Sequence, residues 1–551
     1  MTNRDPHPTS SLPRVRPRFD VWPSLRGARV PRDNWWVRSL TVLVTGAVAL
    51  AGLAIAGHVE WISYTLPGTM VAIFGHALPY RQRIRTMTGY AILLTLGCGL
   101  AMAVAVVVPG TLWRILVASL LATVIKVAHE ASRVGPPSVI PVFLVTALVF
   151  TPQEWATLPL HTGLVAAGAV IALAVLHAPA LRRPHGPERR AVATAVLAAI
   201  PLHEDPSSHA ARDALAIAIA NAARMSEMAK RTPELTALEE HIISAERVLS
   251  DPSLGSPERA RADARAIERD RDLPEPLLTE AERRELDGVR IERASPHAFA
   301  ERHRILAAFH PRSASMPFFW RTLVGTLAAA LISFALGADR PFWAITTVAV
   351  ILQPTLQLTW RKAPARAVGA LLGVGAFALL APLARTDVLV TALLIVVLGA
   401  AVEAFIVRNY VVGQLLVTPM ALLISELGSS APVAELTLER LVDTVVGVVV
   451  ALAVSFLIRN RHVRLRARAA VDRLDAAVDA AEQLPATTGA VTILRTRREL
   501  VRGLGAVASS VRDADGEWWS PTLDRAHIIA VRRRAHQALA DLPRSSGSPE
   551  S

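Results

Sequence analysis

Apolar and polar residues alternate along this chain in long blocks. A transmembrane helix needs about 20 mostly apolar residues to cross about 30 Å of hydrocarbon. Runs of that kind, almost free of charge, cover residues 38–57, 62–79, 86–108, 111–128, 138–151 and 159–178, and again 318–337, 342–359, 365–383, 388–407, 410–426 and 439–458. The pattern predicts an all-α membrane protein with six spans, a long polar stretch and six more spans.

An even number of spans returns the chain to the side of the membrane where it started, so the two sets of spans must have the same orientation. The fifth runs also share a sequence pattern, because the V-G-x3-V-x-P that begins at Val134 recurs at Val412. Recurrence of a pattern at a fixed spacing indicates an internal repeat. We therefore expect two parallel six-helix transmembrane repeats.

The composition excludes an ordinary series of soluble domains, because 52% of the 551 residues are hydrophobic and only 19% are charged. The formal charge is +13, and the basic excess lies in the two tails and beside the apolar runs. The preference of Lys and Arg for cytoplasmic loops explains this charge without nucleic acid. The basic residues on one set of connections are Arg81, Arg83, Arg85, Lys126, Arg133, Arg361, Lys362, Arg366 and Arg408, against Arg340 and Arg385 on the other. We expect a multi-pass protein of the plasma membrane with both termini and the central polar stretch in the cytoplasm.

The same pattern predicts how the chain is divided. The expected segments are a basic tail (1–37), the first repeat (38–180), a helical cytoplasmic domain (181–316), the second repeat (317–459) and a helical cytoplasmic C-terminal region with a disordered end (460–551). Helical spacing of apolar residues predicts polar-region helices at 208–230, 233–250, 298–309, 462–483, 490–512 and 522–540. Thr279 and Glu282 have capping-box spacing. We expect the C-terminal helices to pack on the central domain.

Motifs for nucleotide-driven transport or for catalysis are absent from the sequence. The polar segments contain neither G-x-x-x-x-G-K-[ST] nor a Rossmann glycine pattern, and the sequence has no H-E-x-x-H. His297, His303 and His310 do not fall on one helical face, as metal ligands would. Residues 513–516 predict a turn, because their glycine comes too early for an EF-hand loop. With Cys98 as the single cysteine, we expect no enzyme activity, cofactor or metal.

Ionisable residues inside apolar runs are candidates for function, since each costs several kcal/mol unless it is paired or faces water. Glu403 lies deep in its run, and neither Gly399 nor Val407 offers it a partner on the same helix. A carboxyl group so placed could carry a proton. The alternative is an interfacial glutamate that pairs with Arg408 or with another helix.

Lys126 and Glu130 are four residues apart at the inner end of the fourth run, with His129 beside them. Snorkelling at the lipid headgroups is one interpretation, and a cytoplasmic vestibule for anions is the other. Asp443 has Arg440 one turn away and predicts an interfacial pair.

Pro141 and Pro419 interrupt the two fifth runs at corresponding places. Broken helices near the midplane free backbone groups to meet a ligand in many transporters. A proline in a span can equally produce a packing kink.

The second half carries a recognisable series of residues. Phe342-Trp343-Ala344 is followed by Gln353-Pro354, by Arg361 in a basic loop, and by Arg366 and Gly369 opening the next run, and Thr418-Pro419 comes later. These features resemble the fusaric-acid-resistance-like family, also called aromatic acid exporters. The resemblance implies six-helix bundles, each followed by a cytoplasmic helical region, and efflux of aromatic or other organic acids.

We therefore expect a secondary, proton-coupled exporter of amphipathic organic anions, with the substrate between the two halves. The candidate pathway residues are Glu403, Arg408, Lys126, His129, Glu130, Pro141, Pro419, Gln353, Pro354 and Arg361. One alternative is a passive anion channel, because plant aluminium-activated malate channels are distantly similar in layout. A second alternative is a non-transporting scaffold that binds a partner through its cytoplasmic domain. The sequence leaves the substrate and a homo-oligomeric state open.

Overall fold

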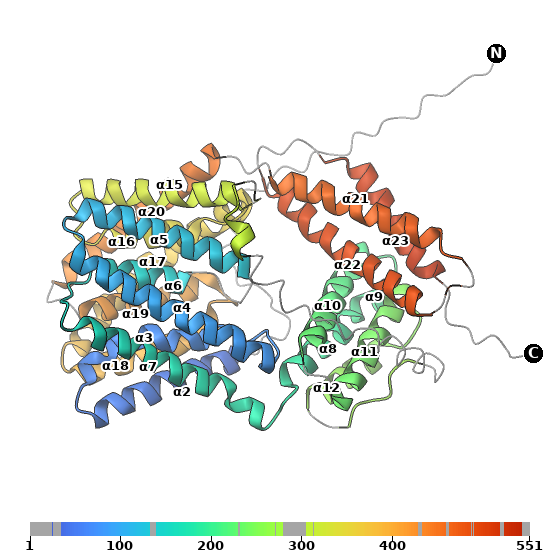
Figure 1. The fold of residues 1–551 in the computed structure, drawn as a ribbon, viewed down its shortest axis with the longest axis horizontal. Helices are drawn as coiled ribbons and strands as arrows, with labels where there is room; N and C mark the ends of the chain where they lie inside the picture. Colours follow the sequence, from blue (N-terminus) through green and yellow to red (C-terminus); the bar gives the residue numbers. More distant parts are fainter. Residues whose placement is uncertain are drawn as a thin grey trace, which may run out of the picture.

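A computed structural model describes residues 25, 35–132, 139–229, 232–269, 272–278, 305–311, 313, 315–427, 432–458, 462–485, 488, 490–517 and 523–542. Every regular element in this part of the chain is helical. Figure 1 shows a block of long, roughly aligned helices on the left and a smaller group of helices on the right. We call the first the apolar block (α2–α7 and α15–α20) and the second the polar bundle (α8–α12 and α21–α23).

The apolar block contains two sets of helices. The first set is α2 (Trp35–Ile55), α3 (Ile62–Thr69, continued by the 3-10 turn η2, Met70–Ile73), α4 (Tyr80–Val107), α5 (Thr111–Ser132), α6 (Val139–Phe150) and α7 (Leu158–His177). The second set is α15 (Met316–Ala335), α16 (Phe342–Ile351), α17 (Leu356–Ala384), α18 (Val388–Phe405), α19 (Tyr410–Glu426) and α20 (Val433–Leu457). Eight of these helices are long and apolar enough to cross a membrane. The chain is a multi-pass helical membrane protein.

The short helices occupy the same places in both sets. They are α3 and α6 in the first set and α16 and α19 in the second, which are the second and fifth of six. Packing within the sets is also alike, because α4 lies against α6 and α7 while α17 lies against α19 and α20. Between the sets, α2 packs on α18 and α15 packs on α5, so the first helix of each set meets the fourth of the other. The arrangement of long and short helices is therefore repeated along the chain.

Small residues allow the short helices to approach their neighbours closely. A β-carbon on Gly68 of α3 would collide with Val165 O of α7, and one on Gly168 of α7 would collide with Thr65 O. In the second set, a β-carbon on Gly369 of α17 would lie 2.8 Å from Val411 O of α19. Backbone contact of this kind is typical of helix pairs in membranes.

Two predicted spans are shorter than expected. In the run 62–79 the helix ends with η2, and the partly buried segment that follows is not helical. The run 342–359 contains a break, because α16 ends at Ile351 and α17 begins at Leu356 with Thr355 as its N-cap. Pro354 lies in this elbow, where it cannot donate a backbone hydrogen bond to a continuing helix.

The polar bundle has one shared core. Its central part contains α8 (Gly186–Ala198), α9 (Ile200–Glu204), α10 (His209–Met228), α11 (Pro233–Ser250) and α12 (Pro257–Glu268), and its C-terminal part contains α21 (His462–Glu482), α22 (Ala490–Asp515) and α23 (Arg525–Asp541). Leu215 of α10, Leu474 of α21 and Leu504 of α22 belong to the same buried cluster. The C-terminal helices thus pack on the central ones through apolar side chains, α22 against α10 among them.

Local sequence explains where several of these helices begin. Thr232 accepts a hydrogen bond from Leu235 N at 3.2 Å and precedes Pro233 at the first position of α11. The predicted cap at Thr279 and Glu282 lies outside the described residues. Of the helix predicted over 298–309, only the end is described, and residues 305–308 are helical.

The polar bundle defines two ends of the apolar block. Helix α7 leads through the short turn η3 (Ala178–Leu181) into α8, and we call the end of the block on that side the bundle-facing end. The N-termini of α2, α4, α15, α17 and α19 lie there, and so do the C-termini of α5, α16, α18 and α20 (Figure 1). The opposite end is the far end.

Candidate functional site

Four cationic side chains form a row inside the apolar block. They are Lys126 of α5, Lys362 and Arg366 of α17, and Arg440 of α20, and we call them the cation row. Lys126, Arg366 and Arg440 are each only 1% exposed. Lys362 lies close enough to Lys126 and Arg366 to interact electrostatically with both, and Arg366 does so with Arg440.

The row runs from one end of the block towards the other. At 1.5 Å per helical residue, Lys126 and Lys362 lie about 9 Å from the bundle-facing ends of their helices. By the same measure Arg366 lies about 15 Å in and Arg440 about 26 Å in. The cations are therefore spaced along most of the depth that a hydrocarbon layer would occupy.

Positive charge in the row exceeds the negative charge beside it. Among the described residues, the acidic groups that interact with the row are Glu130, near Lys362, and Asp443, near Arg440. Asp443 is fully buried, and it accepts a hydrogen bond from Ser333 Oγ of α15. Sequence analysis placed Asp443 at an interface with lipid headgroups, and this prediction is wrong because neighbouring helices enclose the carboxylate.

The guanidinium groups of the row keep unused donors. Arg366 donates one hydrogen bond to Gln414 Oε1 of α19. Arg440 lies over the Trp343 ring, with 4.2 Å from its Cζ atom to the ring centroid. Within the described part of the chain, Arg366 Nε and Arg440 Nε and Nη1 are buried without a hydrogen-bond partner. Buried donors of this kind are costly unless a ligand or water meets them.

Aromatic rings surround the deep end of the row. Trp343 and Phe342 of α16 have ring centroids 4.7 Å apart, and Phe143 of α6 stacks on Trp343 at 5.3 Å. Phe150 of α6 adds a tilted contact with Phe342 at 6.1 Å. Helices α6 and α16 are short helices from different sets, so this aromatic cluster lies where the two sets meet.

Glu403 and Arg408 lie elsewhere, at the contact between α18 and α2. Glu403 is buried, and its Oε2 atom lies 3.7 Å from Arg38 Nε of α2. Arg408 lies over the ring of Trp35 at 5.0 Å, and Ser39 Oγ donates to Ala400 O at 2.7 Å. The structure thus provides Glu403 with a partner on another helix, which is the alternative that the sequence left open.

The group at the end of α5 is more buried than expected. Lys126 does not snorkel, because its Nζ atom lies inside the block, 5.3 Å from the centroid of the Phe318 ring of α15. Glu130 still lies close enough to Lys126 to interact with it electrostatically. His129 packs edge-on against Phe74 and Tyr90 of the first set. The interpretation as a headgroup pair is therefore wrong for Lys126.

The remaining predicted residues shape the helices around the row. Pro419 is buried inside α19, and Pro141 is buried near the start of α6. Gln353 and Pro354 form the elbow between α16 and α17, where Gln353 Nε2 donates to Val350 O at 3.1 Å. Arg361 is exposed, so it does not belong to the cation row.

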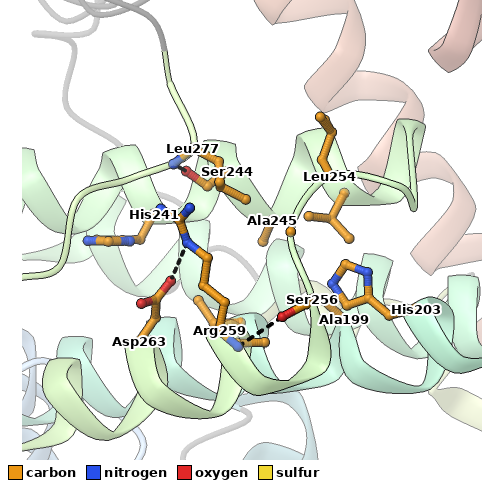
Figure 2. A pocket seen from close by; sticks show the side chains of 14 residues that line it. Ala199, His203, His241, Ser244, Ala245, Leu254, Ser256, Arg259, Asp263 and Leu277 are labelled. Carbon is orange, nitrogen blue, oxygen red and sulfur yellow. Dashed lines mark hydrogen bonds and ion pairs between the residues drawn. The ribbon is translucent and has the colours of Figure 1, made fainter.

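A small cavity in the polar bundle is a second place where polar groups converge (Figure 2). Its volume is about 40 Å³, and its lining includes His203, His241 and Arg259. Arg259 is already engaged, because it donates to Glu275 O at 3.0 Å and pairs with Asp263 at 3.5 Å. Burial lowers the pKa of His241 to about 4, so its ring is neutral at pH 7. A space of this size holds water rather than an organic substrate.

Three carboxylates gather at the far end of the block. Oxygen atoms of Asp339, Glu435 and Glu439 lie within 4.8 Å of one another. Arg340 lies among them, 2.7 Å from Glu439 Oε2 and 3.8 Å from Glu435 Oε1. The guanidinium offsets one of their three negative charges.

Sequence analysis missed most of the cation row. It used Lys362 and Arg366 as markers of membrane topology and Arg440 as an interfacial partner of Asp443. One signal was available, because Lys362 and Arg366 are four residues apart and so must lie on one face of their helix. The sequence could not show that this face turns towards Arg440 rather than towards lipid.

Comparison with known proteins places the row within a family domain. Residues 327–454 match the family described as fusaric acid resistance protein-like. This match confirms the resemblance that the sequence predicted, and the matched residues include Lys362, Arg366, Arg440 and Glu403.

Other likenesses are weaker. An uncharacterized protein of Synechocystis sp. is 27% identical over 256 residues, which cover 44% of this chain and 34% of that protein. The match thus spans about a third of the length of this relative. No solved structure matches the chain.

Proposed function

We propose that this protein is a membrane transporter that exports organic anions and that the cation row is their binding path. The observation that carries the proposal is the excess of positive charge, with three buried cations and the half-buried Lys362 beside two carboxylates, and with donors of Arg366 and Arg440 left over. An isolated charge inside a membrane costs several kcal/mol. A bound anion would offset the cost of burying these cations, so anion binding explains why positive charge exceeds negative charge here. The match of residues 327–454 to the fusaric acid resistance protein-like family supports the same conclusion.

We propose aromatic or other amphipathic carboxylates as the substrate class. A guanidinium group holds a carboxylate with two parallel hydrogen bonds, and Arg366 and Arg440 have donors available for this. The Trp343 ring lies against Arg440, and the rings of Phe342 and Phe143 pack on Trp343, so this cluster could hold an aromatic ring. A ligand with one charged end and one flat apolar end fits both features.

We further propose twelve membrane crossings in two parallel repeats in the cell membrane, with the polar bundle and both termini in the cytoplasm. The repeated order of long and short helices supports the repeat. Arg81, Arg85 and Arg361 lie at the bundle-facing end, and basic residues favour the cytoplasmic side. Labelling of single cysteines from outside should miss the polar bundle, and labelling there by an impermeant reagent would refute this topology.

Proton coupling is the finer part of the proposal, and Glu403 is its candidate. Protonation of Glu403 removes the charge that faces Arg38 and so weakens one contact between α2 and α18. These two helices form one of the principal contacts between the sets. Protonation of Glu403 would therefore allow α2 and α18 to move relative to each other. Glu403→Gln should accumulate normally and lose the response of transport to a pH gradient, while Glu403→Asp should retain part of it.

A passive anion channel is the second candidate function, and the continuity of the cation row favours it. The membrane potential alone drives a monovalent anion outward with about 2.3 kcal/mol per 100 mV. Export by this route needs no proton.

Flux of benzoate from liposomes that contain the purified protein separates these functions. A proton-coupled carrier responds to a pH gradient at zero potential, whereas a channel responds to the potential and to the benzoate gradient but not to the pH gradient. Arg366→Gln should abolish flux in both cases, while Arg361→Gln, an exposed change on the same helix, should leave it intact. Absence of benzoate flux under every gradient would favour the scaffold.

A further inference from the structure

The polar bundle contacts the apolar block at the elbow between α16 and α17. Glu517 is the second residue after the C-terminal end of α22, and its Oε1 atom accepts a hydrogen bond from Leu356 N at 3.2 Å. One residue earlier, Gly516 O accepts from Gln357 N at 2.9 Å. Leu356 and Gln357 are the first two residues of α17. Backbone N–H groups at this position have no partner within their own helix.

The contact is buried and involves a second helix. Glu517 is 7% exposed and Arg321 of α15 is 1% exposed. Arg321 Nη1 lies 3.5 Å from Glu517 Oε1, while Arg321 Nε donates to Ile458 O at 3.1 Å. One carboxylate therefore joins the start of α17 to α15 and, through Arg321, to the end of α20.

The fit at this point is close. A β-carbon on Gly516 would lie 3.1 Å from Thr355 Oγ1 and 3.3 Å from Thr355 Cβ. Thr355 is the N-cap of α17 and is itself buried. The segment after α22 thus meets the helix terminus without an intervening layer of side chains.

Helix α17 carries two members of the cation row. Lys362 and Arg366 follow Leu356 by about two and three turns. A side-chain oxygen at the N-terminus of a helix stabilises it by accepting hydrogen bonds from the free N–H groups. We infer that Glu517 is a positioning residue of the anion site, acting from the C-terminal helical region by fixing the start of α17 and thereby Lys362 and Arg366.

This inference rests on the proposed function for its effect on transport but not for its effect on structure. On this inference, the C-terminal helical region helps to position the residues that bind the anion. Glu517→Ala should raise the benzoate KM about tenfold, because the cations are displaced, with a smaller change in the maximal rate. Glu517→Gln keeps an acceptor oxygen for Leu356 N and should give an intermediate KM. Asp515→Asn removes an acid that pairs with Arg525 inside the bundle at 2.6 Å and should leave the KM unchanged.

A covalent bridge provides the rescue test. Thr355→Cys and Gly516→Cys, in a Cys98→Ser background, place sulfur atoms on β-carbons about as close as in a disulfide, where they are roughly 3.5–4.5 Å apart. In the Glu517→Ala protein the oxidised bridge should restore the KM, and reduction should raise it again. A wild-type KM in Glu517→Ala, or no rescue by the bridge, would overturn the inference.

Amide hydrogen exchange separates this inference from the proposed function. In Glu517→Ala, Leu356 and Gln357 should exchange faster than in the wild type, while amides in the middle of α19 stay unchanged. Unchanged exchange at Leu356 and Gln357 would reject the positioning role whether or not the protein transports benzoate. If Glu517→Ala does not accumulate, the same comparison is made with Glu517→Gln, for which partial loss of protection is expected and full protection counts against the inference.

Discussion

The two sets of helices in the apolar block have the same order of long and short members but different interiors. In the first set, the buried Arg83 of α4 donates to the carbonyl oxygens of His76 and Leu78 at 3.0 and 2.9 Å and lies over the Tyr80 ring. In the second set, Arg366 and Arg440 retain donors without protein partners. Arg83 also has one buried donor without a partner among the described residues, its Nε atom, but its Nη2 atom fixes the loop before α4. Arg440 has two such donors, and Arg366 has one. The difference indicates that binding is concentrated in the second set, with Lys126 contributed by the first.

The largest expected effect is on transport by Arg366→Gln or Arg440→Gln. Each change removes a charge that a bound carboxylate would meet, and loss of one partner of a buried charge pair costs about 2–5 kcal/mol. We expect benzoate flux to fall about 30-fold or more. Thermal unfolding in detergent should be unchanged or shifted upward, because a buried charge without a full complement of partners is removed.

The corresponding change in the first set should act on stability instead. Arg83→Gln removes charged hydrogen bonds to the loop before α4 and should lower the free energy of unfolding by about 2 kcal/mol. The benzoate KM of the protein that remains folded should be unchanged. If Arg83→Gln lost transport without losing stability, the claim that the arginine of the first set is structural would be wrong.

Lys126→Gln tests whether the first set contributes to the row. Lys126 lies at the bundle-facing entrance, where a ligand is still partly hydrated, so we expect the KM to rise about threefold to tenfold. The control is Arg361→Gln, which removes an exposed charge from the same end of the block. Equal effects of the two changes would point to general attraction of anions rather than to a site.

The smallest expected effect is the pH dependence of the contact at Glu517. Burial raises the pKa of the Glu517 carboxyl above its ordinary value of 4.5, and Arg321 only partly opposes this. The docked state therefore binds the proton more tightly than the undocked state. Docking should be favoured below pH 4.5 and should weaken as the pH rises through the raised pKa.

Hydrogen exchange at Leu356, corrected for its intrinsic pH dependence, checks this expectation. Burial also raises the pKa of Asp513, near Arg466 and Arg512. Asp513→Asn is therefore the control. The pH dependence should persist in Asp513→Asn and vanish in Glu517→Gln, and the reverse result would assign it to Asp513.

Prediction of the helices in the polar bundle was uneven. The predicted range 233–250 has the same bounds as α11, because Thr232 and Pro233 mark its start. Helices α8, α9 and α12 were not predicted. In the apolar block, the run 62–79 suggested a full span, but the partly buried segment after Ile73 is not helical. Apolar composition alone does not separate a helix from a partly buried loop.

The site was harder to predict because it depends on contacts between distant segments. Arg366 and Arg440 are 74 residues apart in the sequence, and nothing in either run shows that they face each other. Glu403 was predicted from its depth, and its partner Arg38 lies on a helix from the other set. Residues 513–516 were predicted as a turn, but 513–515 belong to the end of α22. Glu517 was not singled out, and its contact with Leu356 spans 161 positions.

Binding of benzoate to the purified protein, measured by calorimetry, tests the central claim most directly. The account predicts saturable binding by the wild type, loss of that binding in the Arg366→Gln, Arg440→Gln double variant, and retention in Arg83→Gln molecules that remain folded. Unchanged affinity in the double variant would contradict the claim that the cation row binds the anion.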